Sequence, residues 1–361
     1  PAIPFRIMLQ AENFKKELVE YEVMRRTLMD KRADEVLTLE DVKAGKATLD
    51  ELIAQLTVEE MAELCVGTER RSGEGNVIGS ASVCVPGAAG DTTSNLLETR
   101  KVPKLILADG PAGLRLERPC TAIPIATTLA QSWDMDLIRR MGEIVGEEMK
   151  QLHVDLWLAP GMNIHRNPLC GRNFEYYSED PVLTGLCAAT ETKGVQSHKG
   201  KGTTIKHFAG NNQEDNRMFT NAHISERALR EIYLKGFEIA VKTAQPYAIM
   251  TSYNLINGVH SANNYDMLQN IARDEWGFEG LVMTDWYTSQ DTTEMGMVSP
   301  SGKYTYSSSV QCIKAGNDLQ MPGCQENVDD IIEAVNGGKE ITKADLQRCA
   351  KHILSIALKT M

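Results

Sequence analysis

The sequence predicts an α/β protein whose main domain is a (β/α)8 TIM-like barrel, preceded by an N-terminal helical connector. From about residue 80 onward, short apolar runs alternate with amphipathic helical patterns, an order typical of a parallel sheet. Eight runs are expected to be strands, the number that closes such a barrel, and 361 residues are enough to build one. The runs are Ser82–Val85, Leu105–Ala108, Ile123–Ala126, Val154–Leu158, Thr203–Lys206, Ala248–Thr251, Leu281–Thr284 and Asp318–Met321.

The chain in front of the barrel has a different pattern from the rest. Apolar residues at helical spacing over residues 49–56 predict the first helix of the barrel domain. Thr57 and Glu60 have the spacing of a capping box that opens the next helix. We therefore expect the barrel domain to cover residues 49–361. Residues 1–48, which begin with Pro1, are expected to be a connector from an upstream domain.

Composition narrows the class of protein. Hydrophobic residues make up 42% and charged residues 24%, which is ordinary for a soluble globular protein. The net charge of -11 disfavours nucleic acid as a partner, and no apolar run approaches the roughly 20 residues of a membrane span. The eight cysteines form no CxxC pair and the histidines lack metal-ligand spacing, so no metal or other cofactor is expected. Scattered cysteines without an N-terminal signal pattern favour a cytoplasmic protein.

Polar residues gather where the predicted strands end. In a (β/α)8 barrel the carboxyl ends of all strands point to one face, and active sites lie on that face. Residues far apart in the sequence are therefore expected to converge on one pocket. These strand-end residues are Asp109, Lys206, His207, Tyr253, Asp285 and Trp286.

Six ordered segments around these positions resemble the motifs of one known family. Lys206–Glu214 with Arg217 is similar to the pattern KHF-x-x-N-x-Q-E-x-x-R, and Gly280–Trp286 is similar to a nucleophile strand. The family with these motifs is glycoside hydrolase family 3, and the resemblance runs from about residue 50 to the end. It also implies a non-proline cis peptide bond within Lys206–Phe208. The other four segments are Asp109–Arg115, Gly171–Pro181, Met250–Asn254 and Ala315–Gly323.

The resemblance implies a retaining, exo-acting β-glycoside hydrolase of the β-glucosidase type. It would release a terminal sugar from a β-linked glucoside or oligosaccharide through a covalent intermediate on Asp285, the nucleophile. A partly buried nucleophilic carboxylate must stay ionised, so cations are expected beside it. The residues expected to bind the substrate are Asp109, Arg172, Lys206, His207, Arg217, Met250, Tyr253 and Trp286.

Other functions and simpler roles for these residues stay open. A β-xylosidase or a mixed-specificity β-glycosidase would carry the same motifs, and a sugar-binding pseudoenzyme is the alternative outside enzymes. Arg172 could brace Glu175 in an ion pair, and Arg217 could be part of the scaffold. Tyr253 and Trp286 could belong to the packed core.

The general acid/base is expected outside this chain. In most of the family it is a Glu on an α/β sandwich domain, and no such domain follows the last predicted helix. We therefore expect an upstream or separate sandwich domain to be the partner that supplies this group. One branch of the family uses a His on a loop of the barrel, but residues 210–217 contain no His. Four carboxylates on long predicted loops are in-chain alternatives: Glu69, Glu74, Asp291 and Glu294.

Overall fold

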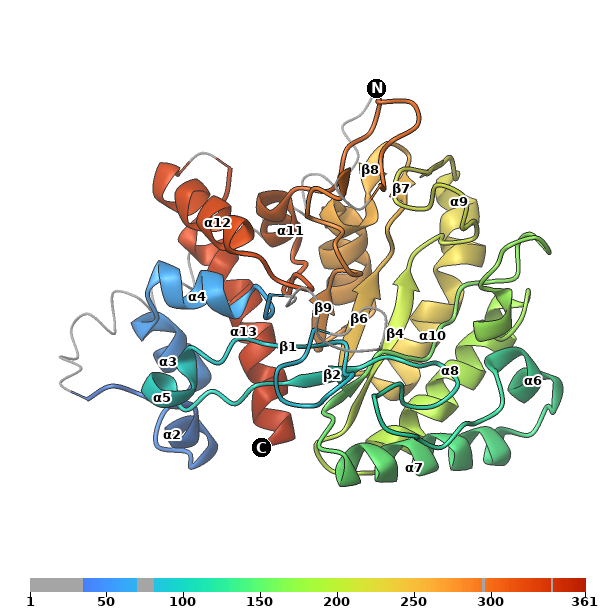
Figure 1. Cartoon of the computed structure of the whole chain (residues 1–361), viewed down its shortest axis with the longest axis horizontal. Helices are drawn as coiled ribbons and strands as arrows, with labels where there is room; N and C mark the ends of the chain where they lie inside the picture. Colours follow the sequence, from blue (N-terminus) through green and yellow to red (C-terminus); the bar gives the residue numbers. More distant parts are fainter. Residues whose placement is uncertain (1–34, 70–80, 294–295, 339) are drawn as a thin grey trace.

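The computed structural model describes residues 35–69, 81–293, 296–338 and 340–361. Its main sheet has six strands in the order β1-β2-β3-β4-β6-β9 (Figure 1). β1 pairs with β2 in antiparallel fashion, and all other neighbours are parallel. The strands are β1 (Gly90–Asp91), β2 (Ile106–Ala108), β3 (Leu156–Trp157), β4 (Gly202–Phe208), β6 (Ala248–Thr251) and β9 (Leu281–Met283).

Two further segments close this sheet into a ring. Residues 319–320 bridge Met283 of β9 on one side and Val66 on the other, both in parallel. The second segment, residues 66–69, contains this Val66. Its Thr68 N–H donates to the carbonyl of Asp91 at 2.9 Å, which joins residues 66–69 to β1. The ring therefore has eight positions, six of them strands and two of them bridged segments. This is the closed arrangement of a (β/α)8 TIM-like barrel, with one antiparallel position.

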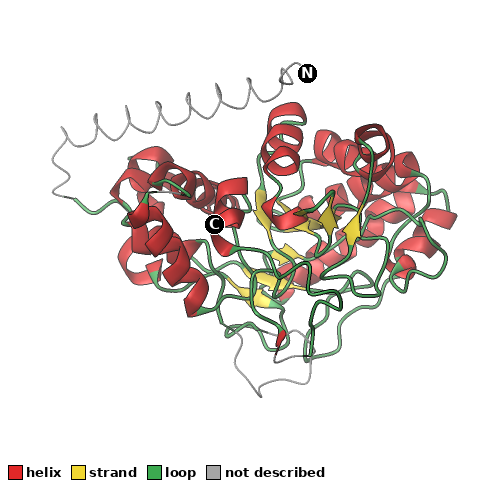
Figure 2. Cartoon of the chain, turned by 90° about the horizontal axis from the view of Figure 1, so that it is seen from above, coloured by secondary structure: helices red, strands yellow, loops and turns green. Residues whose placement is uncertain are grey.

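Helices lie on several sides of the ring, and loops gather on the side that is lowest in Figure 2. α7, α8 and α10 pack side by side next to β4, while α3, α4, α12 and α13 pack together near β9 (Figure 1). A small sheet of β5 (Asn221–Ala222), β7 (Leu255–Ile256) and β8 (Val259–His260) lies beside the ring.

Threonine side chains cap the N-termini of several of these helices. Thr48 and Thr57 each accept a backbone N–H three residues on and form capping boxes, as predicted for Thr57.

Within the described residues, none of the helices combines the length and the apolar character that crossing a membrane requires. The helices are α2 (Leu39–Lys43), α3 (Leu49–Gln55), α4 (Val58–Leu64), α5 (Leu96–Arg100), α6 (Ala126–Gln131), α7 (Met135–Gln151), η1 (Asn173–Glu175), α8 (Pro181–Gln196), α9 (Glu226–Ala228), η2 (Leu229–Tyr233), α10 (Lys235–Ala244), η3 (Ser261–Asn263), η4 (Asp266–Glu275), α11 (Ser309–Ala315), α12 (Gln325–Gly337) and α13 (Lys343–Thr360).

Both faces of the barrel strands are buried. Ala248 and Met250 of β6 join the apolar cluster that includes residues of α4 and α13. Ile249, between them, joins the cluster that includes residues of α8 and α10. Successive side chains of a strand point to opposite faces, so a strand covered on both sides needs apolar residues at every position. This burial explains why the sequence shows continuous apolar runs, and it leaves the strand ends as the place for polar groups.

Two of the eight predicted strands are wrong. Residues 82–85 form a turn, because the Ser82 hydroxyl accepts the N–H groups of Cys84 and Val85 at 3.1 and 2.9 Å. Residues 123–126 contain Pro124, which has no N–H for a strand ladder, and Ala126 already begins α6. β1 and residues 66–69 fill positions in the ring instead.

The predicted connector is only partly within the described residues. Residues 1–34 lie outside them. Leu39 of α2 is fully buried in the same apolar cluster as residues of α3 and α13. The division at residue 48 and the link to an upstream domain stay predictions.

A buried carboxyl on α8 gives a testable pH dependence of stability. Glu191 is 2% exposed, and the hydroxyl of Tyr177 donates to one of its oxygens. Burial raises the pKa of Glu191 from 4.5 to about 7. Between these two values the unfolded chain loses the proton while the folded chain keeps it. Stability is therefore expected to fall by about 3 kcal/mol as the pH rises from 4.5 through 7.

Glu191→Gln removes this titration, so the variant should gain about 3 kcal/mol relative to the natural chain between pH 4.5 and pH 8. Urea unfolding at several pH values measures the difference. Glu333→Gln, on an exposed position of α12, is the matched control and should show no such trend. A constant difference between Glu191→Gln and the natural chain would contradict the prediction.

Candidate active site

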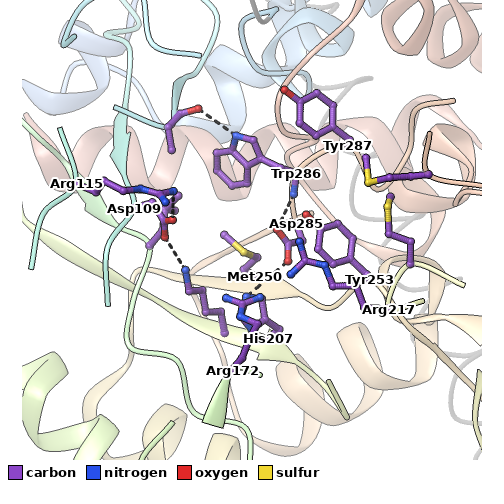
Figure 3. A pocket seen from close by; sticks show the side chains of 15 residues that line it. Asp109, Arg115, Arg172, His207, Arg217, Met250, Tyr253, Asp285, Trp286 and Tyr287 are labelled. Atoms are coloured by element: carbon purple, nitrogen blue, oxygen red, sulfur yellow. Dashed lines mark hydrogen bonds and ion pairs between the residues drawn. The ribbon is translucent and has the colours of Figure 1, made fainter. Parts of the chain in front are cut away.

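A cavity of about 540 Å³ opens at the carboxyl ends of the barrel strands. Asp109 follows β2, Lys206 and His207 lie on β4, and Asp285 follows β9. The structure brings all nine predicted site residues to this cavity, and Figure 3 shows how they surround it. They are Asp109, Arg172, Lys206, His207, Arg217, Met250, Tyr253, Asp285 and Trp286.

Asp285 places one carboxylate oxygen in the cavity without a hydrogen bond from the described residues. Its Oδ1 accepts the backbone N–H of Trp286 at 2.7 Å, whereas Oδ2 is buried and accepts none. Burial raises the pKa of Asp285, and the charges of Arg172, Arg217 and Lys206 oppose that rise. These cations favour the ionised carboxylate, so Oδ2 is suited to bond to an electrophilic carbon.

Asp109 lies between two cations on another wall of the cavity. Lys206 Nζ is 2.7 Å from Asp109 Oδ1, and Arg115 Nη2 is 2.5 Å from Asp109 Oδ2. Burial raises the pKa of this carboxyl, but Lys206 and Arg115 outweigh it and hold the pKa at about 2. Asp109 is therefore ionised at any physiological pH. An ionised carboxylate beside an ammonium group offers both the acceptor and the donor that a sugar hydroxyl needs.

The two arginines combine scaffold and cavity positions. Arg172 forms an ion pair with Glu175, and Arg217 Nη1 is 2.8 Å from Glu214 Oε2. The Arg217 guanidinium also lies over the Tyr253 ring, 4.9 Å from its centroid. Both arginines still line the cavity. The bracing role considered for Arg172 and the scaffold role considered for Arg217 are thus compatible with a contact to substrate.

His207 is held by its backbone at the cavity floor. Asn163 Oδ1 accepts the His207 N–H at 2.8 Å, and Asn163 Nδ2 donates to the His207 carbonyl at 2.9 Å. The Lys206–His207 peptide bond is cis, as the sequence resemblance implied. Burial, followed by the charges of Arg172 and Lys206, lowers the pKa of His207 well below its usual range. The imidazole is therefore neutral in the folded protein.

Trp286, Met250 and Tyr253 give the cavity its apolar surface. Trp286 is 8% exposed, and its ring N–H donates to the Ala89 carbonyl at 3.1 Å, which fixes the indole. Tyr253 is also 8% exposed, and burial raises the pKa of its hydroxyl well above the usual range. Both aromatic residues belong to packed clusters and line the cavity at the same time. Such surfaces suit the apolar faces of a sugar ring.

Residues 46–356 match the family model of the glycosyl hydrolase family 3 N-terminal domain. The chain belongs to this family. It is 40% identical over 331 residues to a β-glucosidase of Ruminococcus albus, an alignment that covers 91% of this chain and 33% of that protein. It is 44% identical over 277 residues to an exo-α-(1→6)-L-arabinopyranosidase of Bifidobacterium breve, which covers 73% of this chain and 34% of that protein.

Solved structures of family 3 proteins share the fold. β-Glucosidase 3B of Thermotoga neapolitana, in complex with glucose, is 43% identical with a TM-score of 0.74, over 85% of this chain and 42% of that one. The chain spans about a third of the length of the curated relatives that it matches.

Several residues of this family 3 cavity were missed in the sequence. Arg115 was part of a recognised motif, so its position six residues after Asp109 was an available signal. Tyr287 lies one residue beyond the Gly280–Trp286 motif, so its position next to Trp286 was the available signal. Met218 and Met297 carried no signal, because a Met that belongs to no motif is predicted to be a residue of the hydrophobic core. The cavity residues outside the prediction are Ala89, Arg115, Leu158, Met218, Tyr287 and Met297.

Among the described residues that line the cavity, the carboxylates are Asp109 and Asp285. Asp109 is engaged by Lys206 and Arg115. Of the four in-chain candidates for the acid, Glu69 lines a different cavity and Asp291 is exposed and bonded to Thr293. Glu74 and Glu294 lie outside the described residues. No group of His, Cys, Asp or Glu in the described part of the chain has the arrangement of a metal site.

Proposed function

We propose that the protein containing this chain is a retaining, exo-acting β-glucosidase. The observation that carries the proposal is the buried Asp285 Oδ2, which faces a cavity and is surrounded by Arg172, Arg217 and Lys206. In this mechanism Oδ2 attacks the anomeric carbon of the terminal sugar while the bond to the leaving oxygen breaks. Water then hydrolyses the glycosyl–aspartate ester, and the two inversions give net retention.

The remaining cavity residues are assigned to sugar binding. Asp109 and Lys206 would accept from and donate to hydroxyls at the end of the sugar remote from the reacting carbon. Arg172 supplies further donors, His207 contacts the sugar from the same wall, and Trp286 supplies an apolar face. This division is supported by charge, because charge-assisted hydrogen bonds are stronger than neutral ones and need not compete with water in a buried site.

The general acid/base is assigned to an α/β sandwich domain outside this chain. Retaining enzymes place their two carboxyl groups about 5–5.5 Å apart. Asp109, the other carboxylate described in the cavity, is held ionised with a pKa of about 2 and cannot give up a proton at neutral pH. The proposal is also supported by the share of its relatives that the chain spans, about a third.

We also propose a cytoplasmic location. Its support is that all eight cysteines carry free thiols, several of them buried. Thiols of this kind are typical of proteins in reducing compartments.

The function is tested by trapping the intermediate. Incubation with 2-deoxy-2-fluoro-β-glucosyl fluoride should add one fluoroglucosyl group to the chain, because the fluoride leaves without a proton and the fluorine at C2 slows hydrolysis. Intact mass spectrometry measures the adduct, and peptide mapping should place it on Asp285. An adduct on another residue would refute the nucleophile. No adduct with any sugar tested would favour a sugar-binding pseudoenzyme.

A second specificity is favoured by one comparison. The arabinopyranosidase relative shares 44% identity over 277 residues, so a pentopyranoside substrate fits the same family motifs. The substrate of the β-xylosidase alternative, a β-xyloside, is likewise a pentopyranoside without a C6 hydroxyl. Comparison of kcat/KM for nitrophenyl β-glucoside, β-xyloside and α-L-arabinopyranoside decides between them. A preference of more than tenfold for either pentoside would replace the β-glucosidase assignment.

A further inference from the structure

A row of buried polar groups leads from the barrel wall to the proposed nucleophile. Asn211 Nδ2 donates to the Tyr176 hydroxyl oxygen at 3.1 Å, and that oxygen lies 3.1 Å from His207 Nδ1. The other ring nitrogen, His207 Nε2, lies 3.6 Å from Asp285 Oδ2 (Figure 3). All four residues are buried, with exposed fractions from 0% to 7%. Their protons are therefore placed by one another and not by bulk water.

The charge of Asp285 and the hydrogen-bonding capacities of its neighbours favour one placement of the protons. His207 is neutral, so one ring nitrogen carries a proton and the other accepts. An ionised carboxylate can only accept, so the nitrogen that faces Asp285 is the one that carries the proton. His207 Nδ1 is then an acceptor, and the Tyr176 O–H donates to it. The oxygen of Tyr176 is then able to accept the N–H of Asn211, 3.1 Å away.

Tyr176 is fixed well enough to hold this arrangement. Its carbonyl accepts the Thr127 hydroxyl at 2.8 Å and a ring nitrogen of His165 at 2.9 Å. Its ring meets the imidazole of His207 edge-on, with centroids 6.2 Å apart and planes at 71°. The hydroxyl is therefore the part of Tyr176 that binds His207.

We propose that Tyr176, oriented by Asn211, is a positioning residue that fixes the Nε2–H tautomer of His207 and so directs a hydrogen-bond donor at Asp285 Oδ2. The separation of 3.6 Å is longer than a hydrogen bond, and catalytic hydrogen bonds often tighten only in the substrate complex. With the other tautomer, a lone pair of His207 would face the carboxylate and repel it. The catalytic consequence rests on the proposed function, whereas the tautomer itself does not.

Other charged groups face Asp285, and the test keeps them unchanged. They are the cations Arg172, Lys206 and Arg217, together with the hydroxyl of Tyr253. Near Tyr176, the carboxylates of Glu175 and Glu214 pair with Arg172 and Arg217. None of these is altered in a Tyr176→Phe or an Asn211→Asp variant.

The tautomer is read directly by NMR of the chain labelled with ¹⁵N-histidine, in which His207 is one of seven histidines. Couplings between ring nitrogens and carbon-bound ring protons distinguish the two tautomers, and a His207→Gln spectrum assigns the signal. We expect the Nε2–H tautomer in the natural chain. In Asn211→Asp the new carboxylate accepts the Tyr176 proton, so His207 should change to the Nδ1–H tautomer. An Nδ1–H tautomer or an imidazolium in the natural chain at pH 7 overturns the proposal.

The catalytic effect is read from the rate of trapping by the fluorinated glucosyl fluoride between pH 4 and 9. Tyr176→Phe should slow trapping about tenfold at pH 7, the effect of one lost hydrogen bond. Loss of a donor to an ionised carboxylate raises its pKa, so the acidic limb of the profile should move to higher pH.

Tyr177→Phe is the matched control, because it also removes one buried hydroxyl, which donates to Glu191. Its acidic limb should coincide with that of the natural chain. Equal profiles for both variants would mean that the effect of Tyr176 is structural only, and would overturn the proposal. If Tyr176→Phe does not fold, Asn211→Asp gives the same two readouts. If the tautomers behave as expected and no variant is ever trapped, the proposed function fails while the tautomer assignment stands.

Discussion

Asp285→Asn is expected to lower the hydrolysis of 2,4-dinitrophenyl β-glucoside by more than about a hundredfold, because the amide cannot form the glycosyl ester. Sugar binding and the fold should be retained, since Asn keeps the shape and can still accept the Trp286 N–H at Oδ1. Initial rates measure the loss, and calorimetric titration with glucose measures the binding. A dinitrophenyl leaving group needs no protonation, so the assay does not depend on a general acid.

The stereochemistry of a rescued reaction identifies the nucleophile more sharply. In Asp285→Gly, azide can enter the space that the carboxylate leaves and attack the anomeric carbon from that face. One inversion then gives α-glucosyl azide, which NMR distinguishes from the β-anomer. Asp291→Asn is the control, because Asp291 is an exposed carboxylate on the loop after the same strand. Full activity of Asp285→Asn, or loss in Asp291→Asn alone, would contradict the assignment.

The parts of the site that the sequence predicted are those that follow directly from strand order. Asp109, Lys206 and Asp285 each sit at the carboxyl end of a short apolar run, and parallel strands must bring such ends to one face. Local patterns also predicted the Thr57 capping box, because its partner Glu60 is three residues away. In these cases the controlling interaction is close in sequence or is imposed by the barrel.

The parts that were missed depend on contacts between distant residues. β1 has two residues, and Gly90 and Asp91 give no apolar signal for a strand. Residues 66–69 join the ring through single bridges to residues 320 and 323, which no local pattern encodes. The neutral state of His207 likewise arises from burial and from the charges around it, above all Arg172.

The contacts of Asp109 decide which step of the proposed reaction this cavity can support. A general acid must hold a proton at neutral pH and release it to the leaving oxygen. Asp109 is clamped by Lys206 and Arg115, which removes it from this role and commits it to binding. In the proposed reaction the cavity described here would therefore supply attack on the anomeric carbon of glycosides with good leaving groups, whereas assisted departure of a poor leaving group would require an acid from elsewhere.

The rate at which residues 1–361 alone cleave a glycoside is therefore expected to depend on how readily its leaving group departs without a proton. With 2,4-dinitrophenyl β-glucoside the chain should give a burst of one equivalent of dinitrophenol, followed by slow turnover. Methyl β-glucoside and cellobiose should react more than about a hundredfold more slowly than in a protein with the sandwich domain present, since general acid catalysis contributes about 10²–10⁴-fold. Stopped-flow absorbance and product chromatography measure these rates.

Azide distinguishes a chain without a general acid/base from a chain without a nucleophile. It attacks the glycosyl–Asp285 ester without a general base, so it should accelerate the slow phase of the natural chain. Two inversions then give β-glucosyl azide, the opposite anomer to that expected from Asp285→Gly. Substitution of Glu69, Glu74 or Glu294 by Gln, or of Asp291 by Asn, should leave all these rates unchanged. Rapid hydrolysis of methyl β-glucoside by the isolated chain, lost in one of those four variants, would show that the acid lies within this chain.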